Sequence, residues 1–92
     1  MPAPDAYTEL SFIFEDRGSV FTGRIDRVIR RDGLFEVYDY KTFPVRDDET
    51  AYLMKEYAPQ LDIYAKAVKE LFSTEKVKSF IVFTDSGEVR EV

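Results

Sequence analysis

The sequence contains no cysteine and no histidine. Their absence excludes disulfides, thiolate catalysis, zinc sites of the Cys/His kind and every Ser-His-Asp mechanism. Any chemistry must therefore come from carboxylates, lysine, tyrosine, serine, threonine or a hard metal ion. The lack of cysteine also favours a reducing, cytoplasmic setting. No apolar run approaches the ~18 residues that a membrane span requires.

Positive charge is also in short supply. The 92 residues carry 13 Lys and Arg against 18 Asp and Glu, which gives a net charge of −5. Such a chain does not hold nucleic acid by bulk electrostatics alone. The balance still allows a nuclease whose acidic site is bridged to phosphate by a metal ion, with the basic surface supplied elsewhere. At 45% hydrophobic residues, the chain has enough apolar material for one small domain.

The hydrophobic pattern predicts three strands, one helix and two further strands. The strands are expected at residues 7–15, 20–30, 35–42, 76–84 and 88–92. Gly18 and the Asp32-Gly33 pair predict tight turns between the first three strands, with a positive φ at Gly18. The acidic run 47–49 indicates a helix start, and helical spacing continues to Phe72. The expected class is α/β or α+β, in the order β-β-β-α-β-β.

Within these elements the pattern also predicts which side chains share a face. In the second strand, Phe21, Ile25 and Ile29 are expected to point the same way. The helix is expected to bury one stripe, formed by Tyr57, Leu61, Tyr64, Val68 and Leu71. Pro59 lies inside that helix and predicts a kink, or a break into two helices.

The predicted sheet is apolar on both faces. The third strand offers Phe35 and Val37 on one face and Tyr38 and Tyr40 on the other, and the run 80–83 is apolar throughout. Such a sheet requires cover on both sides, yet the sequence predicts only one substantial helix. One explanation is a solvated face with a few exposed aromatics. The explanation we favour is a covering element supplied by another chain or by sequence outside these residues.

Two carboxylates lie inside predicted strands, where aspartate is unfavourable. Asp39 and Lys41 are two residues apart and so share one face of the third strand. If the Asp32-Gly33 turn joins strands two and three, the pairing places Asp26 opposite Asp39. The three charged side chains are therefore expected to form one patch.

This patch has two possible meanings. A divalent cation between Asp26 and Asp39 would relieve their repulsion, and Mg²⁺ commonly takes one or two carboxylates together with phosphate oxygens. Lys41 would then stand beside the bound phosphate as a positive charge. The alternative is a surface salt bridge of Lys41 with Asp39 or Asp26 at a sheet edge.

Three segments carry a resemblance to a known family. Gly23-Arg24-Ile25-Asp26, Asp39-Tyr40-Lys41 and Gln60-Leu61-Asp62-Ile63-Tyr64 lie in this order on a strand, a strand and a helix. Together they resemble the motif series of the PD-(D/E)XK nuclease superfamily, RecB-like branch. The likeness is strongest to the nuclease domain at the C-terminal end of AddA-type, UvrD-like helicase–nucleases, and runs from about Tyr7 to Val92. It implies a restriction-endonuclease-like core and Mg²⁺- or Mn²⁺-dependent cleavage of DNA in recombination and repair.

The resemblance also implies roles for individual residues. Asp26 and Asp39 would ligate the metal together with the main-chain carbonyl of Tyr40, and Lys41 would be the catalytic lysine. The other motif, Q-x-x-x-Y, is matched on the helix.

In that motif, Gln60 and Tyr64 lie one helical turn apart on one face. The family's Q-x-x-x-Y pair is thought to organise the site or touch DNA. For Tyr64, a place in the apolar stripe as a core aromatic is at least as well supported as direct substrate contact. Gln60 lies at the edge of that stripe.

The sequence departs from the family at its start. Family members usually begin with a helix that covers the active-site face, whereas this sequence begins at the first strand. Residues 1–92 are therefore expected to be a single domain, either the C-terminal part of a larger RecB-like nuclease domain or a minimal relative with weak or lost activity. We favour the first, with DNA and the helicase portion of the same polypeptide or complex as partners. The site is expected to lie open to water on the uncovered sheet face, where a second copy could pack as a dimer. Alone, the chain is expected to be a poor nuclease.

Two alternatives to an active nuclease remain open. One is a catalytically inactive domain of the same fold that serves as a DNA-end clamp or a protein-interaction scaffold. The other is an unrelated acidic α+β module in which Asp39 and Lys41 form a surface ion pair.

Overall fold

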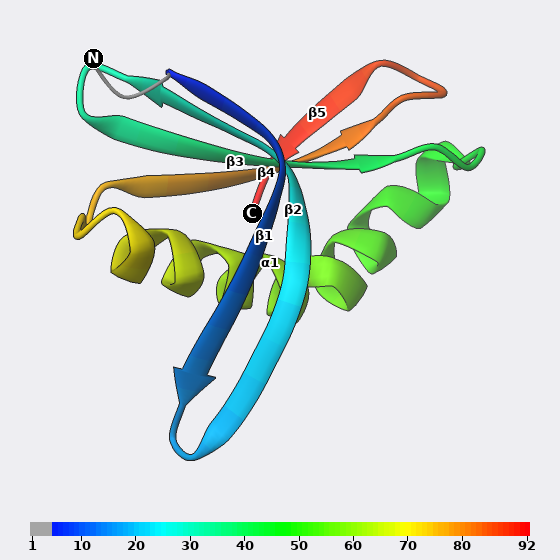
Figure 1. The fold of residues 1–92 in the computed structure, drawn as a ribbon. Coiled ribbons are helices and arrows are strands. Elements are labelled where there is room, and N and C mark those ends of the chain that lie inside the picture. Colours follow the sequence, from blue (N-terminus) through cyan, green and yellow to red (C-terminus); the bar gives the residue numbers. More distant parts are fainter. Residues whose placement is uncertain (1–4) are drawn as a thin grey trace.

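A five-stranded sheet with one long helix on one face forms the structure, a computed structural model that describes residues 5–92 (Figure 1). The elements are β1 (Ala6–Asp16), β2 (Ser19–Arg31), β3 (Leu34–Lys41), the 3-10 turn η1 (Asp47–Glu49), α1 (Thr50–Leu71), β4 (Val77–Phe83) and β5 (Glu88–Glu91). The predicted order β-β-β-α-β-β is confirmed. Spatial order in the sheet follows chain order. The β3–β4 pair is parallel and the other pairs are antiparallel, so α1 serves as the crossover that parallel neighbours require.

The first three strands are joined by two tight turns of one kind. The central residues Arg17 and Gly18 have φ of 52° and 81°, and Asp32 and Gly33 have φ of 50° and 81°. Positive φ at both central residues is the type I′ geometry, whose twist matches that of the flanking strands. The predicted turns, including the positive φ at Gly18, are therefore confirmed.

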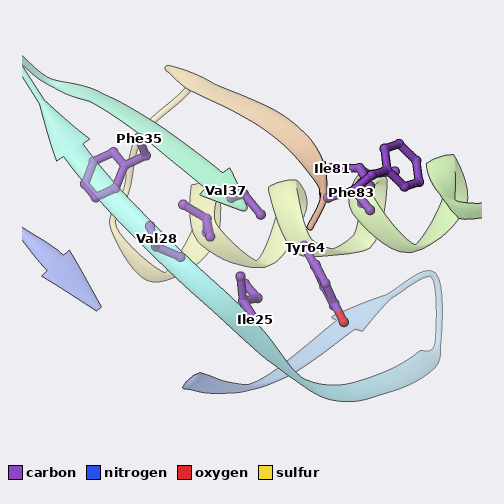
Figure 2. Close-up of a cluster of buried hydrophobic side chains, with 9 residues drawn as sticks. Ile25, Val28, Phe35, Val37, Tyr64, Ile81 and Phe83 are labelled. Atoms are coloured by element: carbon purple, nitrogen blue, oxygen red, sulfur yellow. The ribbon is translucent and has the colours of Figure 1, made fainter. Parts of the chain in front are cut away.

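The core lies between α1 and the sheet face beneath it (Figure 2). Seven side chains have less than 2% of their surface exposed: Phe83, Ile25, Leu61, Ile81, Val28, Val37 and Val68. Burying each such side chain contributes about 1.5–3 kcal/mol. Because several strands and the helix all supply core residues, this packing fixes α1 against the sheet.

Part-way along strand β2, the side chains that face the core switch from odd-numbered to even-numbered positions. Ile25 and Val28 are three residues apart, yet both are fully buried. The pairing of β1 with β2 lapses at Glu9 and Asp26 without a change of register, and Glu9 has a φ of 53°. Strict alternation therefore fails at this point, and Ile29 pairs with a residue of the opposite sheet face. The prediction that Ile29 shares a face with Ile25 was wrong.

Helix α1 runs through Pro59 without interruption from Thr50 to Leu71. Of the two predicted alternatives, a kink or a break into two helices, the break is therefore wrong. Helical residues on both sides of Pro59, among them Tyr57 and Leu61, pack against the same core. That packing keeps the helix continuous although proline cannot donate the helical hydrogen bond. Within residues 5–92, no helix is long and apolar enough to cross a membrane.

The end of the core is closed by the residue that follows the helix. Leu71, predicted to belong to the buried stripe, is 55% exposed, and this prediction was wrong. Phe72 instead stacks on Phe35 with ring centroids 4.6 Å apart and contacts Tyr7 at 5.2 Å. The chain leaves the helix at Phe72, so this ring can turn back onto the sheet while Leu71 stays outside.

The sheet face opposite α1 carries aromatic side chains, as the pattern predicted. Tyr38 of β3 stacks on Phe80 of β4 with ring centroids 5.2 Å apart and 16° between the planes. Tyr40 and Val89 are 38% and 53% exposed. Among the elements of residues 5–92, α1 is the one long helix, and it lies on the other face. This aromatic face therefore has no helical cover in the described part of the chain.

Alanine substitutions test whether Phe72, and not Leu71, packs against the core. Phe72→Ala should lower the free energy of unfolding by an amount near the lower end of the roughly 3–5 kcal/mol typical of Phe→Ala, because Phe72 is half-buried. Leu71→Ala, the matched control, should change it by less than about 0.5 kcal/mol. Urea unfolding of both variants measures this, and equal losses would contradict the packing described above.

Candidate active site

Asp26 lies where strand β2 loses its regular pairing. The β2–β3 ladder runs as far as the pair Arg27 and Tyr38, in the register that the Asp32-Gly33 turn predicted. Beyond that pair, a carboxylate oxygen of Asp26 accepts a hydrogen bond of 2.8 Å from the main-chain N–H of Tyr40. The side chain of Asp26 thus takes over the bond that a strand backbone would make, and its position relative to β3 is fixed.

Asp39 is a charged residue on the core side of strand β3. It continues the row of Phe35 and Val37, and only 5% of its surface is exposed. Burial raises the pKa of the Asp39 carboxyl above its usual value, and the negative charge of Asp26 adds to that rise. The neighbouring Lys41 lowers the pKa without cancelling the other two effects. The two carboxylates are therefore close enough to repel each other.

Lys41 provides the positive charge of this patch. Its Nζ lies 2.7 Å from Oδ2 of Asp39, and the Lys41 side chain is 14% exposed. Oδ2 of Asp39 is shielded from solvent, and within residues 5–92 the ammonium group of Lys41 is its one polar partner. The structure brings Asp26, Asp39 and Lys41 together. One ammonium group then faces two carboxylates, so one negative charge is left uncompensated.

The position of the patch differs from the expectation. We expected the site on the uncovered sheet face, open to water, and that was wrong. Residues two apart on a strand share a face, so Asp39 and Lys41 follow Val37 onto the side that α1 covers. The surface salt bridge considered as an alternative does form between Lys41 and Asp39, but it is buried beneath the helix.

Two helical residues extend the patch. Oε1 of Gln60 accepts a hydrogen bond of 3.4 Å from Nζ of Lys41, and Nε2 of Gln60 donates one of 2.9 Å to the Tyr64 hydroxyl. Tyr64 is 8% exposed, which places it in the core, and its hydroxyl points from α1 toward the β1–β2 hairpin (Figure 2). Burial raises the pKa of Tyr64, and the charges of Asp39 and Asp26 raise it further. Gln60 therefore links the lysine to a core tyrosine.

Gly23 has a steric role behind this tyrosine. A Cβ atom at Gly23 would lie 2.9 Å from the ring of Phe12, far closer than real contacts allow. That ring packs edge-on against Tyr64, with centroids 5.6 Å apart. The glycine thus leaves room for Phe12, which in turn supports Tyr64 from the sheet side.

One residue near the lysine was not singled out from the sequence. Nζ of Lys41 lies 3.9 Å from the centroid of the Tyr57 ring. Helical spacing placed Tyr57 only in the apolar stripe. The available signal was its position three residues before Gln60, which puts both residues on the helix surface facing the lysine.

The donor atoms of this patch fit a divalent cation. Nowhere in residues 5–92 do three or more carboxylates gather as a metal cluster, so the protein offers Asp26, Asp39 and main-chain oxygen. The carbonyl of Tyr40 lies on the same edge of β3 as the Tyr40 N–H that bonds to Asp26. Oxygen ligands alone suit Mg²⁺ or Mn²⁺, and Mg²⁺ needs few protein ligands. A bound cation would neutralise the charge that Lys41 leaves uncompensated and would relieve the repulsion between the two carboxylates.

Comparison with known proteins agrees with this chemistry. The sequence matches the PD-(D/E)XK nuclease superfamily over residues 3–92. The chain belongs to this superfamily. Its mixed sheet and β-β-β-α-β-β order are consistent with a restriction-endonuclease-like fold.

A curated relative is similar over most of this PD-(D/E)XK chain. It is an ATP-dependent helicase/nuclease protein of Oenococcus oeni, which is 35% identical over 66 residues, or 72% of the chain. The matched part is 6% of that relative's length. The chain thus spans only a small part of the length of that relative.

The raised pKa of Asp39 predicts how stability depends on pH in this PD-(D/E)XK domain. A carboxyl whose pKa is raised on folding binds protons more tightly in the native state, so metal-free stability should fall as pH rises from the ordinary value of 3.8 through the raised pKa. Asp39→Asn removes this penalty. The variant should resist urea better than the parent at pH 7, and its advantage should shrink as the pH approaches 3.8. A variant that is less stable than the parent at pH 7 would contradict the prediction.

Proposed function

We propose that this chain is the metal-dependent DNA nuclease module, of exonuclease type and RecB-like, of a larger helicase–nuclease that acts in DNA recombination and repair. The observation that carries the proposal is the buried Asp39 with Asp26 and Lys41 beside it, in a chain of the PD-(D/E)XK superfamily. The name of the Oenococcus relative and the small part of it that the chain spans support the helicase context. On this view, residues 1–92 are the C-terminal part of a larger nuclease domain.

The carboxylates of Asp26 and Asp39 and the main-chain carbonyl of Tyr40 would hold Mg²⁺ or Mn²⁺. When bound, such an ion supplies Lewis-acid polarisation of the phosphate and activation of water. Asp26 is oriented for this role by the N–H of Tyr40. Asp39 is oriented by its place in the core row of β3. Contacts on strands β2 and β3 thus hold both residues in place, which favours a fixed geometry at the reacting phosphate.

Lys41 has no oxygen to offer a metal, so its role is different. Its ammonium group stands beside the ligands, where it can neutralise charge that develops on the phosphate and donate hydrogen bonds to a water molecule. Gln60 accepts a hydrogen bond from this ammonium group and donates one to the hydroxyl of Tyr64. The two helical residues therefore organise the site on the protein side, rather than ligating the metal.

The charge of the chain sets a limit on its activity alone. A net charge of −5 attracts DNA weakly, so we propose that basic surface elsewhere in the polypeptide or complex, such as the helicase portion, gathers the substrate. The 92 residues alone would then be a weak nuclease or none. We place the enzyme in the cytoplasm, in line with its lack of cysteine.

One observation favours a second function. Asp39 is already paired with Lys41, and its pKa is raised, so a chain of this fold could keep the ion pair and bind no metal. It would then act as a DNA-end clamp or a protein scaffold. The aromatic sheet face with Tyr38 and Phe80 could hold a protein partner or a second copy of the chain.

The variant Lys41→Ala separates these functions. In the helicase–nuclease polypeptide that contains this domain, it should reduce cleavage of linear DNA by at least about 10²-fold, as for other groups that stabilise transition-state charge, while Mn²⁺ binding persists. Lys55→Ala removes the same charge from an exposed site on α1 and serves as the control. The same assay on the 92-residue chain should show little cleavage.

Each outcome of this assay has a clear meaning. An active Lys41→Ala enzyme would remove Lys41 from the mechanism. Mn²⁺ binding without any cleavage dependent on Lys41 would favour the scaffold function. No Mn²⁺ binding and no cleavage in the long polypeptide would leave the charged patch as a structural ion pair.

A further inference from the structure

The ammonium group of Lys41 has three partners of different kinds. Asp39 is an anion at 2.7 Å, Gln60 is a neutral acceptor at 3.4 Å, and Tyr57 presents its ring with the centroid 3.9 Å from Nζ. The first partner lies on the same strand as the lysine, and the other two lie three residues apart on α1. Lys41 is therefore held between its own strand and the helix.

Metal binding would change this balance. The oxygen of Asp39 that faces Lys41 has no polar partner other than this ammonium group within residues 5–92, so a cation bound to Asp39 would compete with Lys41 for its charge. A divalent ion and an ammonium group compete for the same carboxylate because both are attracted to its charge. When the ion takes Asp39, the lysine keeps only its two helical partners.

We infer that Tyr57 is a positioning residue that retains the Lys41 ammonium group on the helix side when Asp39 turns to the metal. The inference rests on the proposed function. Tyr57 is suited to this task because its ring is half-buried and packs against the core, which fixes its position. A cation over an aromatic face is attracted most strongly where water is excluded, and the Lys41 side chain is 14% exposed. Through its ring face Tyr57 holds the lysine without offering an anion, so the ammonium group remains available to the phosphate.

Gln60 alone would hold the lysine less well. Its contact with Nζ is long for a hydrogen bond, and the Gln60 side chain is exposed and shared with Tyr64. Exposed polar side chains also exchange their partners readily with water. The ring of Tyr57 is thus the partner that can keep Lys41 near the metal ligands.

NMR spectroscopy of the 92-residue chain tests this inference directly. Protons on the Lys41 carbon next to Nζ should be shifted upfield by the Tyr57 ring, relative to those of exposed Lys55. The shift should persist in Asp39→Asn, which removes the anionic partner without any metal, and in the parent chain saturated with Mg²⁺. Tyr57→Phe keeps the ring and should retain the shift, whereas Tyr57→Leu should lose it.

The affinity for Mg²⁺ gives a second readout, because the Lys41 ammonium group and the metal ion compete for Asp39. In Tyr57→Leu the released ammonium group returns to Asp39, so Mg²⁺ should bind roughly threefold to tenfold more weakly than in Tyr57→Phe. Calorimetric titration measures the ratio. Equal Mg²⁺ affinities in these two variants would count against Tyr57 as the partner that retains the lysine.

The arms of this experiment separate the inference from the proposed function. If Mg²⁺ leaves the backbone amides of Asp26, Asp39 and Tyr40 unshifted, the proposed metal site fails, and Asp39→Asn still decides the role of Tyr57. If the Lys41 protons move to the Lys55 value in Asp39→Asn, or in the Mg²⁺-saturated parent, Tyr57 does not hold the lysine and the inference is overturned.

Discussion

The charge of Asp39 in a buried position is the constraint on which the site depends. An aspartate that is 5% exposed and lies next to a second carboxylate is unfavourable, as its raised pKa shows. Within residues 5–92, the ammonium group of Lys41 is the one positive charge in ion-pair contact with it. A core built only for stability would place an apolar residue there. The unfavourable placement is understandable if the native partner of these carboxylates is a metal ion, as in a PD-(D/E)XK nuclease.

Asp26 and Asp39 come together where the regular pairing of the sheet is interrupted. At Glu9 and Asp26 the pairing of β1 with β2 lapses, and the buried positions of β2 shift from Ile25 to Val28. The carboxylate of Asp26 is then free to accept the N–H of Tyr40 and to lie beside Asp39. Breaks in a ladder are common where a strand redirects a functional side chain. The same irregularity that defeats strict alternation thus forms one half of the site.

Much of the fold could be predicted because it depends on local rules. Period-two alternation and the two turns predicted strands β1 to β3, and the same period placed Asp39 and Lys41 on one face. Three features depend on tertiary contacts, and the sequence could not reveal them. The face that α1 covers is decided by the whole core. The shift of buried positions in β2 occurs where its pairing with β1 lapses, between Glu9 and Asp26. The contact of Tyr57 with Lys41 requires a helix that passes Pro59 unbroken.

The position of a metal ion in a crystal of the chain soaked in Mn²⁺ tests most directly whether Asp26 and Asp39 form a metal centre. We predict anomalous density between these two carboxylates, with oxygen atoms at roughly 2.1 Å as for Mg²⁺-type sites. Lys41 should then have left its 2.7 Å contact with Asp39. Saturating Mn²⁺ that binds elsewhere, or not at all, while Lys41 remains paired with Asp39, would contradict the claim that these carboxylates form a metal centre.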